Sequence, residues 1–305
     1  MNLRDLRYIV AVADLGRFGK AADVCNVSQP TLSGQILKLE QELGVAIFER
    51  VGKQVRTTPA GAEILRHARR TLAAAGDITA SARAASDPLF GPIRLGVIPT
   101  LAPYLMPYIL PLAAERLPKA PLMLVEDLTG RLLGPLADGE LDAILIATDP
   151  GSDRLAQIAL FDEPFWLVMP ADHPLATAKK IRARDIDPKS LLLLTDGHCL
   201  RDQALALCGT HEATGAGPAD VRAASLETLL HLTAAKYGLT LAPRLAVAGW
   251  RTLNATVVAR PIADAGATRR VRLAFRRDMP RQTALEELAA IVCDGLPDCV
   301  TRIPA

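Results

Sequence analysis

The spacing of apolar residues changes near residue 88, and no other feature of the chain constrains its fold as strongly. Before that point, apolar residues recur at the three- and four-residue intervals of helices. From Gly91 onwards, short apolar runs typical of strands alternate with helical segments, a pattern that predicts α/β domains with largely parallel sheets. The 305 residues are enough for two or three domains. We therefore predict a small helical head and a larger α/β body, with Ser86-Asp87-Pro88 as the linker.

The head carries the pattern of two short helices joined by a tight turn. Helical spacing predicts a first helix over residues 3–16 and two more over 18–26 and 28–44. Ser28 is a favourable N-cap for the third helix, and Pro30 falls in its first turn, where the missing N–H costs nothing. This arrangement is typical of a helix-turn-helix.

A basic hairpin and a long helix follow the predicted helix-turn-helix. Residues 48–57 are predicted to form the hairpin, or wing, and Thr58-Pro59 has the cap-then-proline signature of a new helix. Small apolar residues then recur at heptad spacing over residues 65–82. That seam suits packing against the same helix of a second chain, although a buried core helix gives the same pattern.

The charge distribution and the lack of targeting signals limit the class of protein. Residues 1–85 hold 12 Lys and Arg against 8 Asp and Glu, a net +4, whereas the remainder is −2. A mildly basic head on an acidic body favours a nucleic-acid-binding head. No apolar run reaches the ~18 residues of a membrane helix, and no secretory signal is present. We therefore expect a cytoplasmic protein without membrane association. Stable disulfides are rare in the cytoplasm.

Two cysteines in the body, Cys199 and Cys208, lie nine positions apart, and the first has His198 and Arg201 beside it. Positive neighbours favour the thiolate, which is the form that reacts with peroxides. On one helix, residues nine apart are separated by about 13.5 Å along the axis. A disulfide requires Cα atoms within about 7 Å. If this segment is helical, joining the two cysteines therefore requires the helix to come apart. We expect the two cysteines of the reduced protein to lie on such a helix, well beyond disulfide distance.

Two threonines are candidates for a pocket in the body. Thr100 follows the first predicted strand, and Thr129 follows the second. Ligands in α/β folds usually bind at the carboxyl ends of strands. Both hydroxyls can exchange hydrogen bonds with a small polar ligand.

The head resembles the winged helix-turn-helix of LysR-type transcriptional regulators. The similarity rests on Phe18 with Ala21-Ala22, Val27-Ser28-Gln29-Pro30-Thr31-Leu32-Ser33, Phe48-Glu49-Arg50 and Thr58-Pro59-Ala60-Gly61. The order of the later elements also matches that family, so the resemblance covers the whole chain. It implies an α/β fold class with an N-terminal winged helix-turn-helix, a long linker helix and two periplasmic-binding-protein-like α/β subdomains.

The resemblance also implies domain boundaries. The DNA-binding domain would cover residues 1–58, and a linker or dimerisation helix residues 59–87. The regulatory domain would cover residues 88–305, divided into subdomain I (about 91–163 and 268–305) and subdomain II (about 164–267).

Three segments are similar to the peroxide-sensing members of this family. They are Thr31-Leu32-Ser33-Gly34-Gln35-Ile36, Ile98-Pro99-Thr100 with Pro103-Tyr104-Leu105, and Asp196-Gly197-His198-Cys199-Leu200-Arg201-Asp202-Gln203-Ala204 with Cys208. The resemblance implies that Cys199 is the peroxidatic cysteine and Cys208 the resolving one. The peroxide pocket would contain Thr100, Thr129, His198 and Arg201.

The expected function is a DNA-binding transcriptional regulator that detects hydrogen peroxide through a Cys199–Cys208 switch. Expected partners are double-stranded DNA, hydrogen peroxide, further copies of the chain in a dimer of dimers, and RNA polymerase as a candidate. The predicted DNA-binding residues are Gln29, Pro30, Thr31, Ser33, Gln35, Lys38, Arg50, Lys53 and Arg56, whose side chains, apart from that of Pro30, can reach base edges or phosphates. The competing interpretation of these residues is an ordinary solvated polar face.

Other functions fit the sequence less well. A zinc site built from His198, Cys199, Cys208 and His211 has poor ligand spacing, so neither a metal nor a cofactor is expected. No phosphate loop, nucleophile elbow or dinucleotide fingerprint indicates an enzyme. Two alternatives stay open: a LysR-type regulator that binds a small organic effector between its subdomains, and a thiol peroxidase. In the first of these alternatives the cysteines are incidental, and Cys208 is simply a small buried hydrophobic residue.

Overall fold

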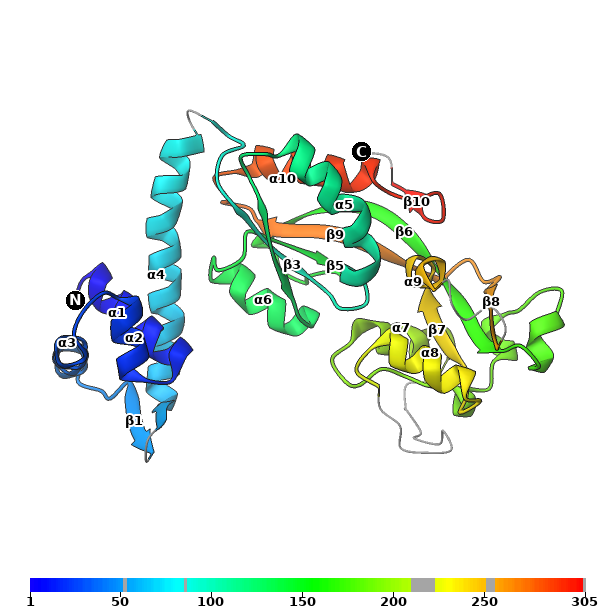
Figure 1. The fold of residues 1–305 in the computed structure, drawn as a ribbon, viewed down its shortest axis with the longest axis horizontal. Coiled ribbons are helices and arrows are strands. Elements are labelled where there is room, and N and C mark those ends of the chain that lie inside the picture. The colour runs from blue at the N-terminus through cyan, green and yellow to red at the C-terminus, as the bar shows by residue number, and fades with distance from the viewer. Residues whose placement is uncertain (52–53, 85–86, 210–222, 251–255, 304–305) are drawn as a thin grey trace. The chain divides into compact units, whose positions relative to one another are not determined.

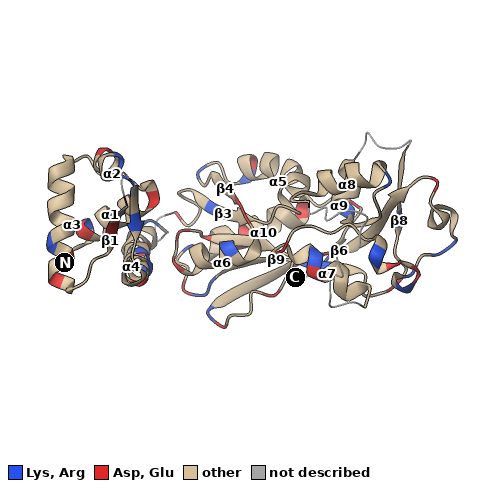
Figure 2. Ribbon diagram, turned by 90° about the horizontal axis from the view of Figure 1, so that it is seen from below, with Lys and Arg blue, Asp and Glu red and all other residues tan. Residues whose placement is uncertain are grey.

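The computed structural model describes residues 1–51, 54–84, 87–209, 223–250 and 256–303 (Figure 1). Contacts divide the chain into two compact units. The first is Met1–Asp87 with Ala137–Glu140, and the second is Pro88–Leu136 with Leu141–Ala305. Acidic and basic residues are interspersed along both units (Figure 2). None of the described helices is long and apolar enough to cross a membrane.

The first unit begins with the three predicted helices, α1 (Leu3–Leu15), α2 (Phe18–Val24) and α3 (Gln29–Leu43). Local signals set the ends of α3, because the Ser28 side chain accepts a hydrogen bond from the Thr31 amide and Gly44 closes the helix at φ 71°. The wing consists of β1 (Phe48–Val51) and β2 (Gln54–Thr57), paired antiparallel. The predicted winged helix-turn-helix is confirmed.

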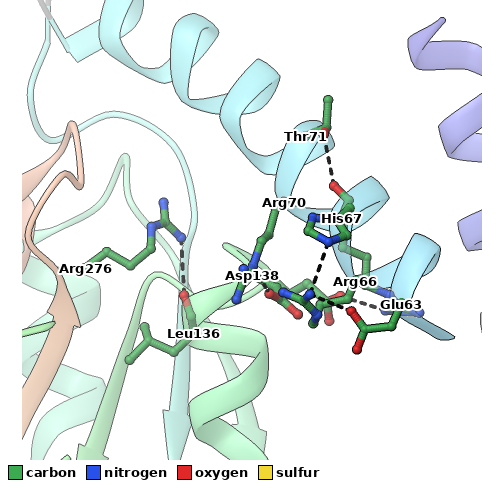
Figure 3. Close-up of polar contacts among 10 residues, drawn as sticks. Glu63, Arg66, His67, Arg70, Thr71, Leu136, Asp138 and Arg276 are labelled. Carbon is green, nitrogen blue, oxygen red and sulfur yellow. Dashed lines mark hydrogen bonds and ion pairs between the residues drawn. The ribbon is translucent and has the colours of Figure 1, made fainter. Parts of the chain in front are cut away.

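Helix α4 (Pro59–Ala84) begins at the predicted proline. Leu65 and Ala68 of the predicted seam are buried in the core of the head itself, and Leu72 packs against that core. Further along, Ile78 is 72% exposed. Ile78 is not itself a seam residue, but Thr79 and Ala82 of the seam are exposed beside it. The first half of the seam is thus core, whereas its end is exposed within the described part of this unit. An exposed Glu63–Arg66 ion pair (2.6 Å) lies on α4 (Figure 3).

The second unit is built on a mixed sheet in the order β10-β6-β9-β5-β3-β4. Its helices α5, α6 and α10 surround one lobe, while α7, α8 and α9 belong to the other (Figure 1). The strands are β3 (Ile93–Val97), β4 (Leu122–Glu126), β5 (Ala143–Ile146), β6 (Leu155–Pro170), β7 (Thr240–Pro243), β8 (Val257–Pro261), β9 (Thr268–Arg276) and β10 (Thr301–Arg302). The helices are α5 (Ala102–Arg116), α6 (Thr129–Ala137), α7 (Cys199–Leu207), α8 (Leu226–Ala234), α9 (Arg244–Gly249) and α10 (Gln282–Asp294), with 3-10 turns at Pro174–Thr177, Ala183–Asp185 and Pro188–Ser190.

The prediction of largely parallel sheets is wrong. Strand β3 pairs in parallel with β4 and β5. In contrast, β9 is antiparallel to both β5 and β6, and β6 is antiparallel to β7, β8 and β10. The reason is that the 16-residue β6 runs through both lobes and β9 returns along it. A pattern of apolar runs does not reveal strand direction.

The two lobes share one continuous hydrophobic core that includes residues of β3, α5, β6, α7 and α10. Polar interactions also connect elements of this unit. Arg276 of β9, for example, donates a hydrogen bond to the Leu136 carbonyl of α6 at 3.4 Å (Figure 3). Because β6 and β9 connect the lobes, residues far apart in sequence meet where these strands cross between them.

Candidate functional site

The segment with the two cysteines forms one short helix, α7 (Cys199–Leu207). Residue His198 is its N-cap and Cys208 its C-cap, so the cysteines occupy opposite ends. At 1.5 Å per residue they are separated by about 13.5 Å along the axis, well beyond the reach of a disulfide. Both thiols are free. The prediction of a helix that keeps the two cysteines apart is confirmed.

The Cys199 thiol is partly buried, and this burial raises its pKa. The positive charge of Arg269 and the hydroxyl of Thr129 act in the opposite direction, but burial has the larger effect. Positive charge favours the Cys199 thiolate as expected, but it comes from Arg269, and burial outweighs it, so the net effect of the surroundings is to raise the pKa of the thiol.

His198 and Arg201, the two neighbours expected to supply positive charge, have other roles in the structure. Burial leaves His198 only 7% exposed and lowers its pKa, so its imidazole is neutral near pH 7 and offers hydrogen bonds rather than charge. Arg201 pairs with Asp196 at 3.0 Å and donates to the Leu194 carbonyl at 3.2 Å. Arg201 therefore holds the segment before α7.

Arg269 is a buried cation of the site that was not predicted from the sequence. Its side chain is fully buried, as is that of Glu163, and the two pair at 2.8 Å. Nη1 of the guanidinium donates to Thr100 Oγ1 at 2.9 Å, and Nη2, which also pairs with Glu163, donates to the Thr100 carbonyl at 3.0 Å. Glu163 Oε1 in turn accepts the Leu245 amide at 2.8 Å. Arg269 lies in the basic run of β9, and nothing in that run distinguishes a buried arginine from exposed ones.

Thr100 lies at this buried cation, and Thr129 lies at the thiol. Thr100 is 3% exposed and bound to Arg269, as described above. Thr129 begins α6, and its Oγ1 is buried without a hydrogen-bond partner among the described residues. A weak hydrogen-bonding interaction of this hydroxyl with the Cys199 sulfur lowers the pKa of the thiol, so the two groups lie close together but fall short of full hydrogen-bond geometry. A buried hydroxyl without a partner is costly, and a small polar ligand at the thiol would satisfy it.

Two contacts fix α7 against the first lobe. Gln203 donates from Nε2 to the Ala147 carbonyl at 2.8 Å. Gly197 has a φ of +93°, and a Cβ there would lie 2.9 Å from a methyl carbon of Leu128. A glycine is therefore needed just before the cysteine helix. Both contacts would be disturbed if α7 unwound.

Cys208 and the alternative metal site are the remaining predictions for the body. Cys208 is partly buried against the core, and burial raises its pKa. This fits its interpretation as a small hydrophobic residue. Within the described residues, no group of three or more His, Cys, Asp and Glu side chains could hold a metal ion, and His211 lies outside them.

The third helix of the head exposes the residues predicted to contact DNA. Leu32, Ile36 and Leu39 bury one face of α3. The side chains on the other faces are exposed or, for Ser33, partly exposed: Gln29, Pro30, Thr31, Ser33, Gln35 and Lys38. The Thr31 hydroxyl is held 2.8 Å from Ser28 Oγ.

The wing is only partly described. Arg56 of β2 is exposed and lies opposite Glu49 in the register of the two strands. The side chain of Arg50 and the whole of Lys53 lie outside the described residues. The exposed polar face of α3 and the adjacent wing have the form of a surface that enters a DNA groove.

Comparison with known proteins identifies the family of this chain. The family model for the LysR substrate binding domain matches residues 86–296, and that for the bacterial regulatory helix-turn-helix protein, lysR family, matches residues 3–62. The Escherichia coli K12 protein described as "DNA-binding transcriptional dual regulator OxyR" is 41% identical over 292 residues, which are 96% of this chain and 95% of that protein.

Solved structures of OxyR proteins have the same fold. Full-length Pseudomonas aeruginosa OxyR with a cysteine-to-aspartate substitution matches with a TM-score of 0.83 and 39% identity, covering 100% of this chain and 98% of that one. An H2O2-bound cysteine-to-serine mutant of Corynebacterium glutamicum OxyR matches with a TM-score of 0.65 and 35% identity, over 96% and 92% of the two chains. The chain therefore belongs to the LysR family of bacterial regulatory helix-turn-helix proteins and, within it, to the OxyR group.

Proposed function

We propose that this protein is a cytoplasmic transcriptional regulator that senses hydrogen peroxide at Cys199 and reports it to DNA through the winged head. The observation that carries the proposal is the placement of a free thiol beside the unpartnered Thr129 hydroxyl and the buried Arg269 cation. The relatives named above support it, since one is described as a DNA-binding regulator and another as H2O2-bound.

The chemistry proceeds in two balanced steps. The Cys199 sulfur attacks one peroxide oxygen, the O–O bond breaks, and the thiol proton leaves with the other oxygen as water. The product is a sulfenic acid. The Cys208 thiol then displaces the sulfenic oxygen as a second water, which forms the disulfide. Peroxide is the oxidant of the first step, in which it takes two electrons from the Cys199 sulfur. The second step needs no further oxidant, because it shares that oxidation between the two sulfurs.

Each pocket group has a role in the first step. The Thr129 hydroxyl and the Thr100 hydroxyl hydrogen-bond the peroxide oxygens and orient the O–O bond toward sulfur. Arg269 stabilises negative charge on sulfur as the proton leaves, which opposes part of the effect of burial on the thiol. His198 supplies a neutral hydrogen-bonding group at the start of α7, and Arg201 positions the preceding segment.

The second step requires α7 to unwind, since its two ends are about 13.5 Å apart. Closing a loop of about ten residues contributes near 3 kcal/mol by the chain-entropy model. That is comparable with the cost of losing a short helix and its packing. Unwinding would also break the Gln203–Ala147 hydrogen bond. In this proposal the rearranged second lobe alters how the copies of the chain pack.

We also propose that the chain acts as a homo-oligomer, a dimer of dimers. Two apolar surfaces support this. On edge strand β4, Met123, Leu124 and Val125 are 54%, 43% and 45% exposed, and Tyr108 on α5 is 43% exposed. The second is the exposed end of the α4 seam. Surfaces of this kind mark protein interfaces. The domain boundaries proposed for this architecture are residues 1–58, 59–87 and 88–305.

DNA footprinting of the full chain before and after peroxide tests the proposal, with Cys199→Ser as the variant and Cys25→Ser as a matched control. We expect peroxide to change the wild-type and Cys25→Ser footprints and to leave that of Cys199→Ser unchanged. Thiol titration should show two thiols lost per chain, with a 199–208 crosslinked peptide by mass spectrometry. Wild type and Cys199→Ser responding alike would contradict the assignment of the sensor.

Two other outcomes would favour other functions. Thermal stabilisation by a metabolite without loss of thiols would favour a regulator that binds an organic effector. Reductant-dependent multiple turnover of peroxide, without DNA affinity, would favour a thiol peroxidase.

A further inference from the structure

The carboxylate of Glu40 joins the third helix of the head to the wing. Glu40 lies in the last turn of α3, and its Oε1 accepts hydrogen bonds from the backbone amides of Ile47 (2.7 Å) and Phe48 (3.1 Å). Phe48 is the first residue of β1. One side chain from α3 thus binds the backbone where it enters the wing.

The position of Glu40 in its helix is unfavourable on electrostatic grounds. The last turn of a helix carries the negative end of the helix dipole, where an acidic side chain is destabilising. The last turn of α3 has no basic residue to offset this. The two amide hydrogen bonds supply a reason for a carboxylate here, because charge-assisted bonds to backbone N–H groups are among the stronger ones.

The exit of the wing is fixed to the same backbone. The Thr58 amide donates to the Ile47 carbonyl at 3.0 Å, and the Thr58 hydroxyl donates to the Ala46 carbonyl at 2.7 Å. Ile47 itself is fully buried. The strands of the wing are four residues each, and an isolated two-stranded hairpin is only marginally stable. The orientation of the wing therefore depends on these anchors at its base.

We infer that Glu40 is a positioning residue for DNA binding: through Ile47 and Phe48 it sets the wing at the orientation in which the wing and the exposed face of α3 contact one duplex together. The inference rests on the proposed function as a DNA-binding regulator. Glu40 need not touch DNA. Its effect is to let the exposed Arg56 of the wing reach the phosphate backbone while α3 occupies the groove.

The test uses the full chain and a duplex that the wild type selects from a random-sequence pool. The variants are Glu40→Ala, which removes the acceptor, and Glu40→Gln, whose amide oxygen can still accept from both N–H groups. Each is also combined with Arg56→Ala. Affinity is measured over a range of salt concentrations, and the active fraction of each preparation is determined by stoichiometric titration.

We expect the salt dependence of Glu40→Ala binding to be shallower by about one unit of log K per log salt, the amount expected for one lost phosphate contact. Arg56→Ala should weaken binding by the wild type and by Glu40→Gln, but have little further effect on Glu40→Ala. Such non-additivity indicates a shared role. A purely structural role would lower the active fraction without changing the slope.

Equal slopes for wild type and Glu40→Ala, together with an equal effect of Arg56→Ala in both, would overturn the inference. If Glu40→Ala does not fold, as judged by its helix signal, Glu40→Asp replaces it, since the shorter side chain keeps the charge but withdraws the oxygen from the two amides. Failure of the wild type to select any duplex would instead contradict the proposed function.

Discussion

Arg269 donates to Thr100 Oγ1 over 2.9 Å, and both side chains are buried. This bond joins β9 to the loop after β3, next to the thiol whose pKa Arg269 lowers. The same guanidinium neutralises the fully buried Glu163. The cation of the proposed sensor site is therefore also part of the structural core.

Replacing Arg269 with Met should slow the reaction of Cys199. Without the positive charge the pKa of Cys199 rises further, so less thiolate forms at a given pH. Glu163 would be left buried and unpaired, at a cost of about 3–5 kcal/mol. Adding Glu163→Gln removes that penalty and keeps the variant measurable. The readout is the pH dependence of Cys199 alkylation followed by mass spectrometry.

Arg270→Met is the matched control, because Arg270 is the next residue on β9 but pairs with Asp162 at the surface. An alkylation profile unchanged by loss of Arg269, or changed equally by loss of Arg270, would show that Arg269 does not act on the thiol.

The reduced protein should lose stability in alkaline solution because of Cys199. Its pKa is raised on folding, so the unfolded chain releases the thiol proton first. The contribution to stability is complete below the ordinary thiol pKa of about 8.5 and is lost as the pH rises from there to the folded pKa. In that window the free energy of unfolding decreases by up to about 1.4 kcal/mol per pH unit for this group. Urea unfolding with reductant, on both sides of this range, should show a weaker dependence for Cys199→Ala.

A second pH effect should appear in acid because of His198. Burial lowers its pKa, so the unfolded chain takes up a proton first as the pH falls below about 6.5. The stability contributed by neutral His198 is present above that pH and decreases below it, toward the folded pKa. His198→Asn should lack this component of the acid profile. His231→Asn, at an exposed position of α8, is the control. Parallel acid profiles for wild type and His198→Asn would contradict the assignment.

Gly61→Ala should destabilise the head and weaken DNA binding. A Cβ at Gly61 would lie 2.1 Å from the Ile47 carbonyl oxygen, so α4 or the base of the wing must shift. We expect a cost of at least about 2 kcal/mol. Gly76→Ala in the same helix is the control, since no atom lies within 4 Å of its Cβ. That change should stabilise α4 by up to about 1 kcal/mol. Thermal unfolding of both variants is the measurement, and equal effects would contradict the close approach.

Features set by neighbouring residues could be predicted from the sequence. Ser28, Pro30 and Gly44 mark the limits of α3 because caps and turns act within a few residues of the chain. The separation of Cys199 and Cys208 follows from helix geometry once the segment between them is helical, although no side-chain cap marks the start of that helix.

Features set by burial and by contacts distant in sequence were decided only by the tertiary structure. Arg269 and Arg270 are adjacent and look equivalent in sequence, yet β9 turns one into the core and the other to solvent. The pKa of Cys199 follows the balance between burial and the charge of Arg269, which is 70 positions away in the chain. The antiparallel return of β9 along β6 creates that encounter, because strand direction depends on pairing between distant segments and not on their composition.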